Sequence, residues 1–196
     1  VAFTPDSRQV VAASLNGIAK VFDRDTGQLR ARLDGHAAAL MDLAVSPDGT
    51  CVATASRDRT ATLWHIKSRR PLATLHGHRH WVTAVAFSPD GAHLATASRD
   101  GTGGLWQTAD GRLVATLRGH TAMVNHLAFA PRGTLLATAG YDGKILLWAM
   151  PGGQSENPFS KHYRDHHRLW CRDRYVGLVA HPRGMTVLRR HHQSPS

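Results

Sequence analysis

Most of residues 1–150 consist of short stretches in which apolar and polar residues alternate. A turn ends each of these stretches. The segment 81-WVTAVAFSPDG-91 ends in a Pro-Asp-Gly turn, where proline presets φ and glycine supplies a positive φ. Further strands are predicted over 93–98, 103–108 and 112–117, with turns at 99–101 and 109–111. Because no stretch keeps a helical period beyond a turn or two, the pattern predicts a four-stranded antiparallel sheet.

The same unit recurs at a step of 42 residues, marked by Gly-His pairs at Gly35-His36, Gly77-His78 and Gly119-His120. Four other sets of positions keep this step: Pro5, Pro47, Pro89 and Pro131; Ser14, Ser56, Ser98 and Gly140; Asn16, Asp58, Asp100 and Asp142; Phe22, Trp64, Trp106 and Trp148. One small sheet cannot bury both faces alone, so it must stack on like neighbours. We therefore expect an all-β fold, a partial β-propeller of four-stranded antiparallel blades with an irregular C-terminal tail.

The Gly-His pair, the Ser-Pro-Asp-Gly turn, the Ser-x-Asp step and the Leu-Trp strand resemble the WD-repeat β-propellers over residues 1–150. The Asp of the namesake Trp-Asp pair survives only as Asp23, after Phe22. The seven blades usual in this family would need more than 196 residues, so the resemblance implies an arc of a ring. The expected units are an incomplete first blade over 1–33, blades over 34–75 and 76–117, a blade without a clear fourth strand over 118–150, and a divergent tail over 151–196.

The resemblance also implies a buried hydrogen-bonded tetrad in each blade. Its members would be His36, Ser56, Asp58 and Trp64; His78, Ser98, Asp100 and Trp106; and His120, Asp142 and Trp148, where Gly140 replaces the serine. We expect the serine hydroxyl to accept from the indole N–H and to donate to the histidine, whose tautomer the aspartate fixes. The third network should then be weaker by about 1–3 kcal/mol.

Serine, histidine and aspartate also compose a hydrolase triad, which is the rival interpretation of these residues. A triad needs one exposed nucleophile and an oxyanion hole. Here the set recurs with a tryptophan beside it, and the sequence has no G-x-S-x-G nucleophile elbow. A structural role is therefore favoured over catalysis.

The resemblance further implies that partners contact one end of the blades, which we call the top face. The positions that would line it are Arg57, Trp81, Thr83, Arg99, Met123, Asn125 and Tyr141. Trp, Tyr and Arg are enriched at interface hot spots, and an aromatic patch flanked by two guanidinium groups suits an acidic or phosphorylated peptide. The alternative is that Arg57 and Arg99 are solvated copies of a duplicated repeat.

Charge adds a second possible partner class. The chain carries 24 Lys+Arg and 14 Asp+Glu, a net charge of +10. The excess is densest in residues 151–196, which also hold six histidines: His162, His166, His167, His181, His191 and His192. With Cys171 these match no paired zinc-ligand spacing, so no metal is expected. The basic tail permits phosphate contacts, although no RNA-binding motif accompanies it; because 178–184 resembles 127–133, a decayed fifth repeat is another interpretation.

These observations predict a non-catalytic protein–protein interaction scaffold without a cofactor. Its partner would be a protein or peptide of acidic character, with the remaining blades of a parent propeller or self-association as further contacts. The alternative is a nucleic-acid-associated or regulatory propeller segment of a larger multidomain protein whose catalytic domain lies elsewhere. No apolar run approaches the ~20 residues that span a bilayer, so no membrane partner is expected. Cys51 and Cys171 are too few for a disulfide framework; no signal peptide is visible, and localisation stays open, with an intracellular setting favoured.

Overall fold

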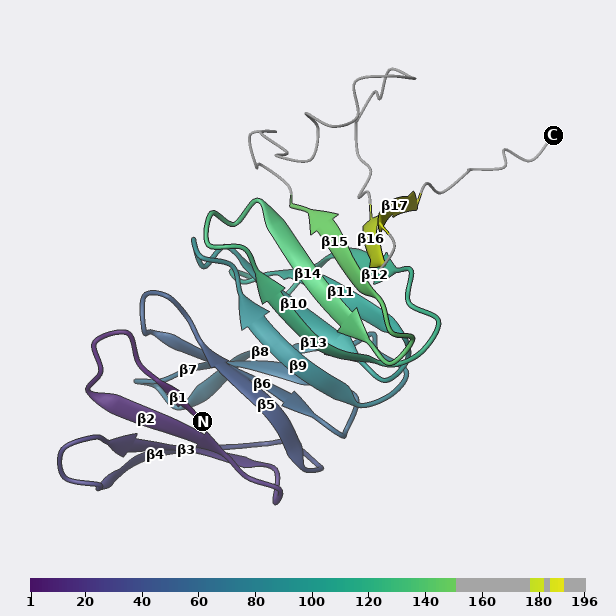
Figure 1. Ribbon diagram of the computed structural model, residues 1–196. Coiled ribbons are helices and arrows are strands. Elements are labelled where there is room, and N and C mark those ends of the chain that lie inside the picture. Colours follow the sequence, from purple (N-terminus) through teal and green to yellow (C-terminus); the bar gives the residue numbers. More distant parts are fainter. Residues whose placement is uncertain (151–176, 182–183, 189–196) are drawn as a thin grey trace.

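The computed structural model describes residues 1–150, 177–181 and 184–188, and every regular element in them is a β-strand (Figure 1). The strands form four sheets, in which consecutive strands pair antiparallel. The first sheet contains β1 (Ala2–Phe3), β2 (Gln9–Ala13), β3 (Ile18–Asp23) and β4 (Leu29–Asp34). The second contains β5 (Leu40–Val45), β6 (Cys51–Ser56), β7 (Ala61–His65) and β8 (Arg70–Leu75). The predicted all-β fold of antiparallel blades is confirmed, with four strands in each of the first three sheets.

The third sheet repeats this order, and the fourth adds a fifth strand to it. The third contains β9 (Val82–Phe87), β10 (His93–Ser98), β11 (Thr102–Gln107) and β12 (Leu113–Arg118). The fourth contains β13 (Val124–Phe129), β14 (Leu135–Gly140), β15 (Ile145–Ala149), β16 (Gly177–His181) and β17 (Gly184–Leu188). Figure 1 shows the four sheets following one another in an arc, which does not close within the described residues.

The Ser-Pro-Asp-Gly turns form as their sequence predicts. Between β5 and β6, Gly49 has a φ of 72°, in the left-handed region that glycine adopts without strain. The Ser46 hydroxyl donates to Asp48 Oδ1 at 2.5 Å and accepts from the Cys51 amide at 2.9 Å. Each turn therefore satisfies its own polar groups and leaves the strands to supply the core.

Successive sheets bury apolar faces against one another, as stacked repeats must. Between the first and second sheets, Val11, Val21 and Leu33 pack with Val52 and Trp64, all at most 2 % exposed. Trp106 and Trp148 fill the next two interfaces in the same way. A tryptophan from each of the last three sheets thus packs toward the sheet before it.

The first strands of neighbouring sheets lie side by side along the inner edge of the arc. On this edge, the Val85 amide donates to Asp42 Oδ2 at 3.0 Å, and the Thr83 hydroxyl donates to the Val124 carbonyl at 2.7 Å. These bonds connect β5 to β9 and β9 to β13, so adjacent blades are held together by polar contacts as well as by apolar burial.

The fourth sheet takes its outer strands from the tail. Residues 118–150 supply three strands, and β16 pairs antiparallel with β15, so that Leu178 lies opposite Leu147. Residues 178–181, which belong to the segment that resembles the opening strand of a repeat, therefore lie in the fourth place of this sheet. His162, His166, His167, Cys171, His191 and His192 lie outside the described residues. No helix long and apolar enough to cross a membrane occurs in the described part of the chain.

Candidate functional site

A hydrogen-bonded relay links the third strand, the second strand and the loop before the first strand in three blades. In the second blade, Trp64 Nε1 donates to Thr54 Oγ1 at 2.8 Å, His36 Nε2 lies 2.8 Å from the same oxygen, and His36 Nδ1 lies 2.7 Å from Asp58 Oδ2. The same three distances are 2.9, 2.7 and 3.0 Å for Trp106, Thr96, His78 and Asp100, and 2.9, 2.9 and 3.0 Å for Trp148, Thr138, His120 and Asp142.

The direction of the bonds follows from the chemistry of the groups. An ionised carboxylate can only accept, so Nδ1 of His36 carries a proton and donates it in a hydrogen bond to Asp58, while Nε2 faces the Thr54 hydroxyl. That hydroxyl in turn accepts from the Trp64 indole, which can only donate. Burial alone would raise the pKa of Asp58, but hydrogen bonds from Thr60 and His36 outweigh it and lower that pKa. The carboxylate is therefore ionised at neutral pH.

The hydroxyl of the relay belongs to threonine, and the prediction that Ser56 and Ser98 accept the indole proton is wrong. Val52 lies opposite Trp64 in the register, which makes Thr54 the diagonal neighbour within reach of the indole, whereas Ser56 lies two residues further along β6. The Ser56 hydroxyl donates instead to the carbonyls of Ala38 and Ala39, at 3.1 and 3.2 Å. The serines thus fasten the loop before the first strand to the end of the second.

The correction changes the expectation for the fourth blade. Thr138 supplies the relay hydroxyl there, so the network of His120, Asp142 and Trp148 is complete without a serine at position 140. The sequence held a signal for this role, because Thr54, Thr96 and Thr138 keep the step of 42 residues. The first blade has Ala12 at the corresponding position and Phe22 in place of the tryptophan.

The relay geometry also bears on the hydrolase alternative. Ser56 makes no hydrogen bond to His36 in the structure, and the Thr54 hydroxyl that does so is fully buried beside Trp64. The His36 side chain is only 2 % exposed. These groups have the contacts of a structural network and lack the exposed nucleophile that acyl transfer needs. Within the described residues, no group of three or more His, Cys, Asp or Glu side chains is placed to hold a metal ion.

The relay positions the loops of the top face. The Arg79 amide donates to Asp100 Oδ2 at 2.8 Å, and the Arg99 amide donates to the Trp81 carbonyl at 2.9 Å. The backbone before β9 is therefore bonded to the turn after β10 at two points. Equivalent bonds join Arg57 to Ala39 and Tyr141 to Met123.

Trp81 is the centre of the described top face. The guanidinium carbon of Arg57 lies 4.5 Å from the centroid of the Trp81 ring, and that of Arg99 lies 4.3 Å from it. Arg57 comes from the second blade and Arg99 from the third, so the indole bridges two blades. His80 packs edge-on to the same ring, with 5.4 Å between the centroids. The structure thus brings together three of the residues that the sequence assigned to partner binding.

The other residues predicted for the top face differ in their exposure. Tyr141 is 67 % exposed, whereas Met123 and Asn125 are half-buried. Thr83 is buried, and its hydroxyl is bonded to the Val124 carbonyl, so its assignment to the exposed surface is wrong. Because alternate residues of an inner strand face opposite ways, Thr83 serves the contact between blades instead of a partner.

A hollow of about 190 Å³ adjoins Trp81. It is lined by Arg57, Arg59, Arg79, His80 and Trp81. Arg59, Arg79 and His80 were missed by the sequence reasoning. A signal for Arg59 was present, because it stands where the other three repeats have Gly17, Gly101 and Gly143.

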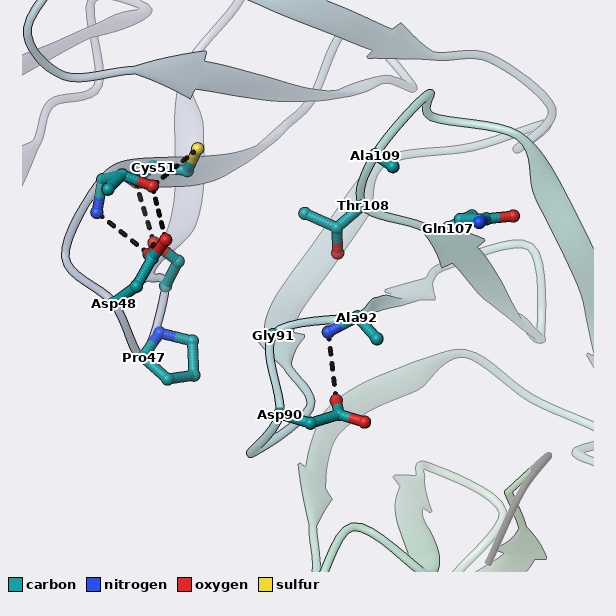
Figure 2. Close-up of a pocket in the computed structure, with 11 residues that line it drawn as sticks. Pro47, Asp48, Cys51, Asp90, Gly91, Ala92, Gln107, Thr108 and Ala109 are labelled. Carbon is teal, nitrogen blue, oxygen red and sulfur yellow. Dashed lines mark hydrogen bonds between the residues drawn. The ribbon is translucent and has the colours of Figure 1, made fainter.

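A larger hollow, of about 570 Å³, lies at the opposite end of the second and third blades and is lined by two Ser-Pro-Asp-Gly turns and residues 107–109. Figure 2 shows the residues that line it. The two carboxylates in this hollow accept hydrogen bonds within their own turns. Bonds from Ser46 and the Thr50 amide lower the pKa of Asp48, and Asp90 accepts from Ser88 and the Ala92 amide. Among the described residues, the Thr108 hydroxyl is buried without a partner. The lining therefore offers no convergent set of catalytic or ligand-binding groups.

Comparison with known families agrees with this architecture. The family model described as "WD domain, G-beta repeat" matches residues 27–65, 69–107 and 111–149. Each match begins just before the fourth strand of one sheet and ends with the third strand of the next. WD40 repeats generally form protein-interaction scaffolds and are typically non-catalytic. No curated protein matches the chain. Since the three matches together span more than half of the sequence and the blades have the corresponding strand order, the chain belongs to the WD40 repeat family.

Proposed function

We propose that the chain is a non-catalytic protein-interaction module whose top face binds an acidic segment of a partner protein. The observation that carries the proposal is the stacking of the Arg57 and Arg99 guanidinium groups on Trp81, at 4.5 and 4.3 Å. Tryptophan and arginine are the residue types that most often dominate binding energy at protein interfaces. Here they come from two blades and meet at one point, and Tyr141, which stands at the position equivalent to Arg57 and Arg99 on the fourth blade, is exposed.

The charge of this surface favours an acidic ligand. Arg57, Arg59, Arg79 and Arg99 form no ion pair within the described residues. Unpaired guanidinium groups keep their charge and their donors available for carboxylate or phosphate oxygens. Long-range attraction by such a cluster would also raise the association rate, in a manner that added salt suppresses.

The relay supports binding by holding the contact loops in place before a partner arrives. Asp100 fixes the backbone of Arg79, and the Trp81 carbonyl fixes that of Arg99. A loop that is already ordered loses less conformational entropy when a ligand binds. The buried polar network is therefore part of the proposed binding device, although it does not contact the ligand.

Selection from a random peptide library displayed on phage tests this function. We expect acidic peptides to be enriched on the native chain and to bind the Trp81→Ala and Arg99→Ala variants at least about tenfold more weakly. The Leu72→Ala variant is the matched control, because Leu72 is an exposed apolar residue on the outer strand β8. Peptides that bind native chain and Trp81→Ala equally would contradict the proposal.

We also infer that a further blade of the same type packs against the open face of the fourth sheet. Ala95, Ala97 and Leu105 of the third sheet are fully buried. The residues one repeat later, Ala137, Ala139 and Leu147, are partly exposed, and the nearby Ile145 is 49 % exposed. An apolar sheet face left in water favours association.

A further inference from the structure

Arg59 occupies a backbone conformation that its residue type disfavours. Its φ is 75°, close to the values of 83°, 80° and 73° at the equivalent Gly17, Gly101 and Gly143. This left-handed region suits glycine and is strained for residues with a Cβ. The second blade therefore carries a long cationic side chain at a turn position where its backbone geometry calls for glycine. Strained residues of this kind cluster at ligand-binding sites.

The side chain of Arg59 lines the hollow beside Trp81 together with Arg57, Arg79 and His80. Two loops build this hollow: the turn between β6 and β7 supplies Arg57 and Arg59, and the loop before β9 supplies Arg79 and His80. Three arginines thus line a space of about 190 Å³ together with Trp81.

The carboxylates that neighbour these arginines in sequence do not neutralise them. Asp58 Oδ2 lies 2.7 Å from His36 Nδ1 and accepts from the Ala37 amide at 3.1 Å. Asp100 Oδ2 lies 3.0 Å from His78 Nδ1 and accepts from the Arg79 amide. Both carboxylates therefore bond within the relay and form no ion pair with the neighbouring arginines. The positive charge of the arginines stays exposed at the surface.

We propose that this hollow binds the phosphoryl group of a phosphorylated serine or threonine in the partner segment, an inference that rests on the proposed peptide-binding function. A phosphoryl group carries about −1.5 to −2 charge at pH 7 and three strong acceptor oxygens. Planar guanidinium groups bind such oxygens through paired N–H donors. Three arginines match the charge and the acceptors of a phosphoryl group better than those of a carboxylate, which has two oxygens and one charge. The Trp81 ring would pack against the adjoining peptide backbone.

Titration with a capped Gly-phosphoserine-Gly tripeptide tests the proposal directly. The signal is the indole ¹H–¹⁵N resonance of Trp81 in the labelled full chain, assigned by its loss in Trp81→Phe. We expect a saturable shift with the phosphorylated tripeptide, and at least about tenfold weaker binding of the Ser and Glu versions. The Arg59→Gly variant should bind the phosphorylated tripeptide about tenfold more weakly. Because glycine suits this turn, that loss cannot be attributed to misfolding.

The matched control is Arg132→Ala, which removes an exposed arginine from the turn before β14, at the opposite end of the blades. It should leave the affinity within about twofold, as expected for a distant charge screened at 0.15 M salt. Equal affinity for the phosphoserine and Glu tripeptides, or unchanged binding by Arg59→Gly, would overturn the proposal. So would a single-stranded oligonucleotide that displaces the tripeptide at lower concentration, because the hollow would then belong to a nucleic-acid site.

The two proposals fail in different ways. If the phosphorylated tripeptide does not bind but library-selected peptides still depend on Trp81, only the phosphoryl assignment falls. If the selected peptides also bind independently of Trp81, the proposed function falls with it.

Discussion

The indole nitrogen of Trp106 lies 2.9 Å from the hydroxyl oxygen of Thr96, inside the core of the third blade. His78 Nε2 lies 2.7 Å from the same oxygen. One hydroxyl therefore serves two buried polar groups at once, and its removal would leave both without a partner.

Replacing Thr96 by valine tests this role with little change of shape. Unsatisfied buried polar groups cost about 1–3 kcal/mol each, so with two such groups we expect Thr96→Val to lower the free energy of unfolding by at least about 2 kcal/mol. Thr96→Ser keeps the hydroxyl and should cost less than about 1.5 kcal/mol, mostly for the lost methyl group. Urea unfolding followed by circular dichroism measures both. Equal destabilisation by the two variants would contradict the assignment.

A serine at position 140 should destabilise the fourth blade, contrary to the expectation from sequence. A Cβ at Gly140 would lie 2.7 Å from Asp142 Oδ1 and 2.9 Å from His120 Cε1. Since the relay there is complete with Thr138, the added side chain crowds the relay and supplies none of its bonds. We expect Gly140→Ser to lower the free energy of unfolding by about 1–3 kcal/mol. A measured gain in stability would restore the original interpretation.

The period of 42 residues was enough to predict the strands, the turns and the partial propeller, because each landmark has a local physical cause. It could not decide between Ser56 and Thr54 as the relay hydroxyl. Both keep the period and both lie on one face of β6, and the choice depends on the register between β6 and β7. Register is a property of the paired strands, which a single strand's sequence does not display.

On the top face, too, the sequence predicted individual residues but not how they are arranged in space. Trp81, Arg57 and Arg99 could be assigned from their places in the repeat, but not the distance between them, because Arg57 belongs to a different blade. The hollow with Arg79 and His80 depends on two loops meeting in space. In the sequence, residues 151–176 separate β15 from β16, so the 42-residue period did not predict the pairing of these strands.

Lowering the pH should reduce the stability that the relay provides. Burial alone would raise the pKa of Asp100, but hydrogen bonds from His78, Thr102 and the Arg79 amide lower it below its ordinary range. A carboxylate with a depressed folded pKa stabilises the protein above its unfolded pKa of about 3.9, and this contribution is lost as pH falls toward the folded value. We expect stability to fall below about pH 4 and to fall less steeply in Asp100→Asn. Urea midpoints between pH 7 and pH 3 measure the slopes, and identical slopes would refute the assignment.

Arg59→Gly should keep or increase stability. Glycine relieves the strain of a positive φ, worth about 1 kcal/mol, although it also adds freedom to the unfolded chain. Arg57→Gly is the control, because Arg57 has no positive φ and glycine brings only the entropic cost there. Thermal unfolding of both variants compares them. A clear loss of stability in Arg59→Gly would mean that Arg59 has a structural role.

Light scattering during size-exclusion chromatography tests the open face of the fourth sheet. If a second copy supplies the further blade, the molar mass should rise with protein concentration above the 21.4 kDa of one chain. Ile145→Lys places a charge on that face and should reduce association. A stable monomer at all concentrations, unaffected by Ile145→Lys, would contradict self-association through this surface.

The most direct test of the account is the dissociation constant of a library-selected acidic peptide for native chain and for the Arg57→Ala/Arg99→Ala double variant, measured by fluorescence anisotropy at 0.15 M salt. If the Arg57–Trp81–Arg99 stack forms the binding surface, the double variant should bind at least about tenfold more weakly while its unfolding midpoint stays unchanged. Equal dissociation constants for the two proteins would contradict the account.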